Sequence, residues 1–204
     1  MPRSTATTEP QEDQDAGDAG GRGNRGSAIL RAATELFASR GFDATSMRDV
    51  AAAAAVQPAS LYYHFASKES LLLAVVEPAA RDLAAAIESA STKGDPWRRL
   101  EAACAVHLEA LLNGEGAVRV LATEIPSRRD GELQDALLNL RRDYEKVFRE
   151  LIDALPLPPR VDRKYLRLTL LGAINWTLIW YRPGDDAPEE IATKIIKVLR
   201  QGTR

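Results

Sequence analysis

The stretch Val56–Leu71, VQPASLYYHFASKESL, decides how this chain folds, because it places four ring-bearing side chains next to one another. Tyr62, Tyr63, His64 and Phe65 are consecutive in a chain of 204 residues that is only 6% aromatic. A helix with one buried face carries its apolar residues three or four positions apart. Four consecutive rings therefore cannot share one core, and some of them must face something outside it.

Two short helices are predicted around this stretch. Ser46-Met-Arg-Asp49 has the form of a capping box and opens a helix over Met47–Ala54. Pro58 suits the first turn of a second helix, which runs to about His64. Two helices of this size joined by a short link are typical of a helix-turn-helix, whose second helix enters the major groove of DNA by its N-terminal half.

The residue types of the second helix suit such a role. Gln57, Ala59 and Ser60 are small or polar and would let the helix approach the bases. A second group can donate hydrogen bonds to phosphate, namely Tyr62, Tyr63, His64 and Lys68. Leu61 and Phe65 are four residues apart and would point into a small core. A helical hairpin does not by itself imply DNA, so a hairpin with ordinary core and surface rings stays open.

The rest of the chain also carries helical signals and has no strand candidate. Further helices are predicted over residues 27–41, 67–91, 95–113, 117–123, 131–155, 161–181 and 188–201. The fold class is therefore all-α, with an N-terminal three-helix helix-turn-helix domain and a larger helical domain. Residues 1–26 contain almost no large apolar side chains and are predicted to be a disordered tail. The predicted domains are residues 27–71, which bind DNA, and residues 72–204, which bind ligand and dimerise.

Charge and composition add little support for DNA binding. The chain has 27 basic and 29 acidic residues, so a nucleic-acid role has to rest on a local arrangement. The single cysteine, Cys104, and the lack of a secretory signal favour a cytoplasmic protein. The apolar run Leu166–Tyr181 is interrupted by Arg167 and Asn175 and is shorter than the roughly 20 residues of a membrane span. We expect a buried helix there and no membrane partner.

Residues 29–72 closely resemble the DNA-binding region of the TetR family of bacterial repressors. The family pattern is F-x-x-x-G-F/Y, then T/S, V-A-x-x-A and L-Y-x-H-F-x-S-K-E-x-L. The residues that match it are Phe37, Gly41, Phe42, Thr45, Ser46, Val50, Ala51, Leu61, Tyr62, His64, Phe65, Ser67, Lys68, Glu69 and Leu71.

The resemblance implies a set of DNA contacts and a dimer bound to operator DNA. It implies base contacts from Arg48, Gln57, Ala59 and Ser60, and phosphate contacts from Thr45, Ser46, Tyr62, Tyr63, His64 and Lys68. One departure is Ala55, where the family usually has glycine before the valine of the turn. If this position needs a positive φ, alanine strains it by about 1 kcal/mol and the angle of the recognition helix changes.

The C-terminal region resembles one subgroup of that family. Leu140–Leu151 contains R-x-x-Y-x-x-x-F, and Leu171–Gly184 contains N-W-x-x-x-W-Y-R-P. The subgroup includes repressors of fatty-acid and sterol breakdown that respond to acyl-CoA thioesters, so the resemblance implies a small hydrophobic effector of this kind. Another departure is Leu155-Pro-Leu-Pro-Pro159, where similar proteins have glycines.

A pocket and a dimer interface are predicted from apolar residues on these helices. The pocket candidates are Trp97, Leu100, Cys104, His107, Leu111, Val118, Leu121, Leu137, Tyr144 and Phe148. The interface candidates are Leu171, Trp176, Trp180, Ile191, Ile195 and Val198, since an all-apolar helix needs neighbours on every side. Any of these residues could instead simply pack in a core. Arg141 and Arg142 could meet a CoA phosphate or lie on a solvated face.

An enzyme is the weaker alternative. Glu101, Cys104 and His107 step by three along one helix and could form a nucleophile–base pair or a metal site. No oxyanion donor or phosphate loop accompanies them, so we predict no catalysis, no metal and no cofactor. The predicted function is a ligand-responsive transcriptional repressor. A transcriptional activator stays open as well, and so does an interaction module whose DNA-binding region has degenerated.

Overall fold

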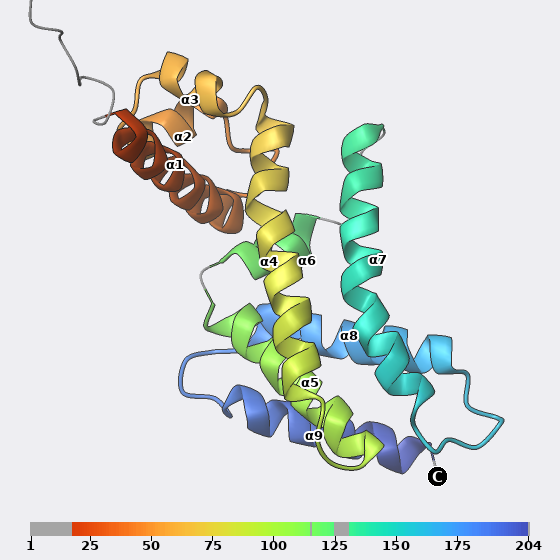
Figure 1. The fold of residues 1–204 in the computed structure, drawn as a ribbon. Helices are drawn as coiled ribbons and strands as arrows, with labels where there is room; N and C mark the ends of the chain where they lie inside the picture. Colours follow the sequence, from red (N-terminus) through yellow and green to blue (C-terminus); the bar gives the residue numbers. More distant parts are fainter. Residues whose placement is uncertain (1–17, 115, 125–130, 204) are drawn as a thin grey trace, which may run out of the picture.

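The computed structural model describes residues 18–114, 116–124 and 131–203, with side chains from residue 24 onward. Within these ranges the chain forms nine α-helices and no strand, which confirms the predicted all-α class (Figure 1). The helices are α1 (Asp18–Arg40), α2 (Met47–Ala53), α3 (Pro58–His64), α4 (Lys68–Ala90), α5 (Pro96–Leu112), α6 (Ala117–Glu124), α7 (Glu132–Asp153), α8 (Arg163–Trp180) and α9 (Pro188–Gly202).

Four of the predicted helix starts carry a side-chain cap, at α2, α4, α5 and α8. The Ser46 hydroxyl accepts the Asp49 N–H at 3.2 Å, and the Asp49 carboxylate accepts the Ser46 N–H at 2.8 Å. These hydrogen bonds satisfy donors that the first turn of a helix leaves unpaired. Ser67 and Ser70 form the same reciprocal pair at the start of α4, and Asp95 caps α5.

The first helix differs from the prediction, because α1 begins at Asp18 rather than after Ser27. Residues 18–26 are therefore helical and do not belong to a disordered tail, whereas residues 1–17 lie outside the described residues. Composition misled here because nucleating a helix is costly but extending one is not. Each residue added to the amphipathic segment that follows gains a backbone hydrogen bond without a new nucleus.

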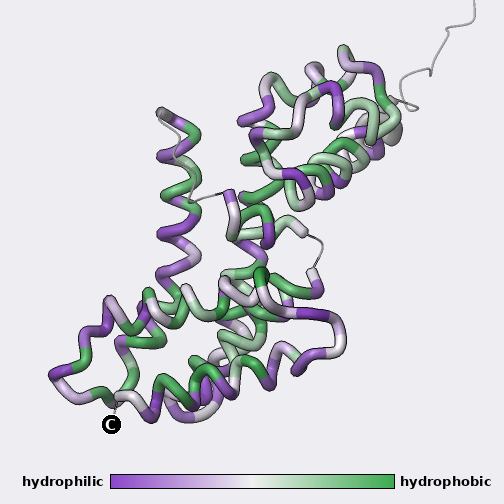
Figure 2. Tube along the Cα trace, turned by 180° about the vertical axis from the view of Figure 1, so that it is seen from behind, coloured by the Kyte–Doolittle hydropathy of each residue, from purple (hydrophilic) through white to green (hydrophobic). Residues whose placement is uncertain are grey.

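The helices enclose two apolar cores that share α4. The first core joins α1, α2, α3 and the N-terminal half of α4, and Val120, Leu121 and Leu137 of α6 and α7 complete it. The second core joins the C-terminal half of α4 with α5, α7, α8 and α9. The domain boundary predicted after residue 71 thus lies inside one continuous helix (Figure 1). Figure 2 shows apolar and polar residues interleaved along the helices, as expected for helices with one buried face.

Candidate DNA interface and effector pocket

Helix α3 divides the four consecutive rings between core and solvent. Tyr62 and Tyr63 are 54% and 75% exposed, while Phe65 packs against the first core behind the fully buried Leu61. His64 is half-buried, and its ring meets the Tyr63 ring edge-on at 5.5 Å between centroids. The side chains predicted to face bases are accessible as well, since Arg48, Gln57 and Ala59 are exposed and Ser60 is half-buried.

Three side chains that are predicted to contact phosphate also have hydrogen-bond partners within the protein. The buried Thr45 hydroxyl donates to the Gly41 carbonyl at 2.8 Å, and the exposed Ser46 hydroxyl caps α2. The Lys68 ammonium donates to the carbonyls of Phe42 and Thr45 at 2.8 and 2.9 Å and lies 4.2 Å from the centre of the Phe42 ring. Lys68 therefore fastens the start of α4 to the loop before α2, which leaves one of its three N–H groups for a phosphate.

The turn between α2 and α3 has the backbone conformation that glycine would suit. Ala55 has φ of 55°, and it is the one non-glycine residue with positive φ in the described part of the chain. The Val56 N–H donates to the Ala51 carbonyl at 2.9 Å, and the Ala55 N–H donates to the Ala52 carbonyl at 3.1 Å. These two bonds define a Schellman motif, whose left-handed position is usually glycine. The position of Ala55 thus requires the positive φ on which the predicted strain depends.

A cavity of about 190 Å³ lies between α4, α5, α6, α7 and α8. Most of its wall is apolar, and a few polar groups converge on one side, which is typical of a small-molecule site. It is lined by Leu83, His107, Val118, Leu121, Ala122, Arg141, Tyr144, Glu145, Leu171 and Asn175.

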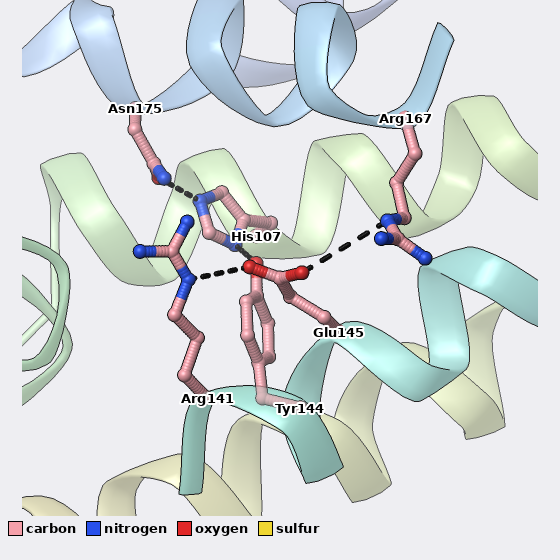
Figure 3. Close-up of polar contacts among 6 residues, drawn as sticks. All are labelled: His107, Arg141, Tyr144, Glu145, Arg167 and Asn175. Atoms are coloured by element: carbon pink, nitrogen blue, oxygen red, sulfur yellow. Dashed lines mark hydrogen bonds and ion pairs between the residues drawn. The ribbon is translucent and has the colours of Figure 1, made fainter. Parts of the chain in front are cut away.

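His107 forms the centre of the polar wall (Figure 3). Its Nε2 lies 2.9 Å from the Asn175 Oδ1, and its Nδ1 lies 2.5 Å from the Tyr144 hydroxyl. Because an amide oxygen only accepts, Nε2 carries the proton and Nδ1 accepts from the tyrosine. Burial lowers the pKa of His107 to about 4, against a smaller opposing effect of the Asn175 hydrogen bond, so the imidazole is neutral near pH 7.

A charged group borders the same cavity (Figure 3). Arg141 Nε donates to Glu145 Oε1 at 2.5 Å, one turn apart on α7. The other carboxylate oxygen of Glu145 lies 3.9 Å from Arg167 Nε on α8, which is too long for a hydrogen bond. Glu145 thus joins two arginines from different helices at the edge of the pocket.

Helix α6 connects this cavity to the DNA-binding region. Val118, Leu121 and Ala122 line the cavity. At the end of the same helix, the buried Glu124 accepts the Phe42 N–H at 2.9 Å, between α1 and α2. One short helix therefore contacts both the cavity and the loop that precedes the helix-turn-helix.

Comparison with known proteins identifies this architecture. A family model for bacterial regulatory proteins of the tetR family matches residues 29–75, and a model for the tetracyclin repressor-like C-terminal domain matches residues 93–203. The chain belongs to the TetR family. It is a DNA-binding transcriptional regulator with a helix-turn-helix, as its sequence resemblance implied.

Individual TetR-family relatives are similar over different shares of the chain. The HTH-type transcriptional repressor KstR2 of Rhodococcus jostii is 27% identical over 184 residues, which cover 85% of this chain and 88% of KstR2. The HTH-type transcriptional repressor Rv3405c of Mycobacterium tuberculosis is 39% identical over 88 residues, or 43% of this chain and 47% of that protein. The crystal structure of AibR in complex with isovaleryl coenzyme A and operator DNA matches with a TM-score of 0.75 and 25% identity, covering 85% of this chain and 97% of AibR.

The cavity at His107 contains only part of the set of residues predicted to line a pocket. His107, Val118, Leu121 and Tyr144 line the cavity. The other candidates do not line the cavity. Leu111 is buried, and the rest lie in the two cores, namely Trp97, Leu100, Cys104, Leu137 and Phe148. Sequence reasoning missed Asn175 and Glu145. Asn175 was detectable, because a polar residue interrupting an apolar helix needs a buried partner.

The C-terminal helices also present an uncovered apolar face. Trp176 and Trp180 of α8 are 63% and 44% exposed, and Val198 of α9 is 68% exposed. Leu168 and Ile179 of α8 extend this face. The other predicted interface residues are placed differently, since Leu171 lines the cavity, Ile191 is buried, and Ile195 packs half-buried against the second core.

The residues of the enzyme alternative do not form a reactive pair. Cys104 is fully buried, which raises the pKa of its thiol well above the usual range, and both ring nitrogens of His107 have other partners. Among the described residues, no group of three or more His, Cys, Asp or Glu side chains is placed to hold a metal ion. None of the described helices combines the length and apolar character that crossing a membrane requires.

Proposed function

We propose that this TetR-family repressor binds its operator in the cytoplasm as a homodimer and is released by the thioester of a short acyl group with coenzyme A. The observation that carries the proposal is the cavity at His107. Helix α6 lines this cavity and also contacts the loop before the helix-turn-helix through the hydrogen bond from Phe42 to Glu124. The structure of AibR with isovaleryl coenzyme A and operator DNA, a protein of similar fold, supports the same class of effector.

The proposed dimer uses the uncovered face of α8 and α9. A row of exposed tryptophan, leucine, isoleucine and valine side chains is costly in water and is typical of a protein–protein interface. A two-fold axis at this face would carry two copies of α3, and operator half-sites are spaced by whole turns of DNA for such dimers. On each half-site, the exposed Tyr62 and Tyr63 would grip phosphates while Gln57 reaches a base edge.

The size of the cavity supports a short acyl group. A cavity of about 150 Å³ in another protein holds one benzene molecule. By that measure the present cavity of about 190 Å³ holds a group somewhat larger than benzene, such as a branched five-carbon acyl chain. In the polar wall, Asn175 Nδ2 has no hydrogen-bond partner among the described residues and could donate to the thioester carbonyl.

Release would follow from a change in the position of α6. An acyl group against Val118, Leu121 and Ala122 pushes on one side of this helix, and the Glu124 carboxylate transmits the shift to Phe42. The effector needs only to prefer the shifted state to bias the equilibrium. A coupling of about 1–3 kcal/mol lowers operator affinity roughly fivefold to 150-fold.

The test is a titration of labelled DNA from the region upstream of the protein's own gene, at fixed salt and with excess nonspecific competitor. We expect competitor-resistant binding that isovaleryl-CoA releases and palmitoyl-CoA does not. Ala122→Leu partly fills the cavity and should blunt the release, whereas Ala86→Leu makes the same change at an exposed position of α4. Competitor-resistant DNA binding that no acyl-CoA alters would reject the proposed class of effector. Failure of a genome-fragment selection to recover any bound DNA would reject the repressor.

A further inference from the structure

A second, strongly basic cleft lies along the contact between α7 and α8. It has a volume of about 190 Å³ and is lined by Arg149, Ile152, Asp153, Arg163, Lys164 and Arg167. Four of these six side chains are cationic and one is anionic, in a chain whose net charge is −2. We call this site the basic cleft. Such a concentration of guanidinium and ammonium groups suits a phosphate-bearing ligand.

Arg167 lies between the basic cleft and the cavity at His107. Its side chain is only 15% exposed, and it faces Glu145 of the cavity wall at 3.9 Å (Figure 3). The buried Nε atom of Arg167 has no hydrogen-bond partner among the described residues. Buried donors in folded proteins are nearly always paired, so this atom indicates an acceptor that arrives with a ligand.

The other cations differ in their hydrogen bonds and in their exposure. Arg163 donates from its two terminal nitrogens to the carbonyls of Ile152 and Leu155, and the second of these bonds is 3.1 Å. Arg163 is therefore fixed at the end of α7 and keeps its charge within the basic cleft. Arg149 and Lys164 are exposed and supply N–H groups that can turn toward an anion.

The spacing of the two sites suits one extended ligand. On α7 the cavity is lined by Arg141 and Glu145, and the basic cleft by Arg149 and Asp153, two turns further on. Eight residues of helix span about 12 Å. The chain of α8 returns past the same residues, with Asn175 and Leu171 at the cavity and Arg167 and Arg163 at the basic cleft. A pantetheine arm is about as long as four extended residues, or about 14 Å.

We propose that the basic cleft binds the phosphate groups of the coenzyme A whose acyl end fills the cavity at His107. This inference rests on the proposed function, and it assigns the recognition of the CoA moiety to residues that the acyl pocket does not contain. The phosphates supply the acceptor that Arg167 lacks and pair with Arg149 and Lys164 at the surface. A free carboxylic acid with the same acyl group would lack these contacts and bind more weakly.

The test is calorimetric titration of the full chain with isovaleryl-CoA, isovaleryl-pantetheine and inorganic pyrophosphate. The variant Arg149→Gln with Lys164→Gln removes two charges from the basic cleft. The matched control Lys93→Gln with Lys146→Gln removes two charges from exposed positions that do not line it. We expect the cleft variant to bind isovaleryl-CoA about tenfold more weakly. Its affinity for isovaleryl-pantetheine should equal that of the wild type, and the control should bind both as the wild type does.

Three results overturn the inference. If the wild type binds isovaleryl-CoA and the cleft variant binds it equally well, the inference fails while the proposed effector stands. If the wild type binds pyrophosphate as tightly as the thioester, the basic cleft is an independent anion site. A wild type that binds neither thioester rejects the proposed effector and the inference together.

Discussion

The substitution Ala55→Gly should stabilise the protein although it removes a methyl group. Ala55 is exposed and has φ of 55°, so its side chain contributes no packing and holds the backbone in a disfavoured region. The left-handed conformation costs an L-residue about 1–2 kcal/mol, and glycine avoids this cost. Glycine also gives the unfolded chain more freedom, which offsets about 0.4–1 kcal/mol. The net gain in free energy of unfolding is about 0.5–1 kcal/mol.

The assay is urea unfolding at fixed protein concentration, because a dimer's stability depends on concentration. We expect the variant to unfold at a higher urea concentration, with an unchanged slope of the free energy of unfolding against urea. Its melting temperature should rise by about 1–4 °C. The matched control is Ala53→Gly, an exposed position two residues earlier in the last turn of α2, where glycine should destabilise by about 0.5–1 kcal/mol. If both glycines destabilise the protein equally, the strain attributed to Ala55 does not exist.

Three further perturbations test the rest of the structure. His107 faces Tyr144, Asn175, Arg141 and Glu145, and burial lowers its pKa to about 4. Between that pH and about 6.5, the unfolded chain therefore binds more protons than the folded protein does. The free energy of unfolding should therefore fall as the pH drops through this window, by about 3 kcal/mol in total, and urea unfolding of His107→Gln should show a flatter profile. Glu124→Ala removes the buried acceptor of the Phe42 N–H and should cost about 1–3 kcal/mol in thermal unfolding, with Glu124→Gln recovering most of it. Trp176→Glu should give a folded monomer in analytical ultracentrifugation, and a dimer that persists would contradict the proposed interface.

Local signals in the sequence predicted eight of the nine helices found within the described residues to within about two positions. They succeeded because the residues that start these helices lie next to the turn they start. The Ser46 hydroxyl caps the Asp49 N–H at the start of α2, and prolines open α3, α5 and α9. The first helix failed for the opposite reason. Its start depends on extension from a segment stabilised by tertiary packing, which residue composition does not report.

The pocket was less predictable, because it is built from residues that are distant in the sequence. His107 and Asn175 are 68 positions apart, and Tyr144 comes from a third helix. Apolar periodicity identifies which face of a helix is buried, but a wall of a cavity and a packed core have the same pattern. Lys68 shows a related limit at the candidate DNA interface. Its residue type suits phosphate, but only the fold shows that two of its three N–H groups are used by the backbone carbonyls of Phe42 and Thr45.

The placement of α6 gives a physical reason why a small ligand could control DNA binding in this chain. Rigid packing resists gradual deformation, so a ligand acts through an element that can occupy two positions. Helix α6 has eight residues, and its buried side chains are Val120, Leu121 and Glu124. Its link to the helix-turn-helix includes a hydrogen bond from Phe42 to a carboxylate, which is directional, whereas apolar contacts tolerate sliding. Shortening Glu124 to aspartate should therefore weaken the release of operator DNA by the effector in the DNA titration, because the shorter side chain no longer reaches the Phe42 N–H.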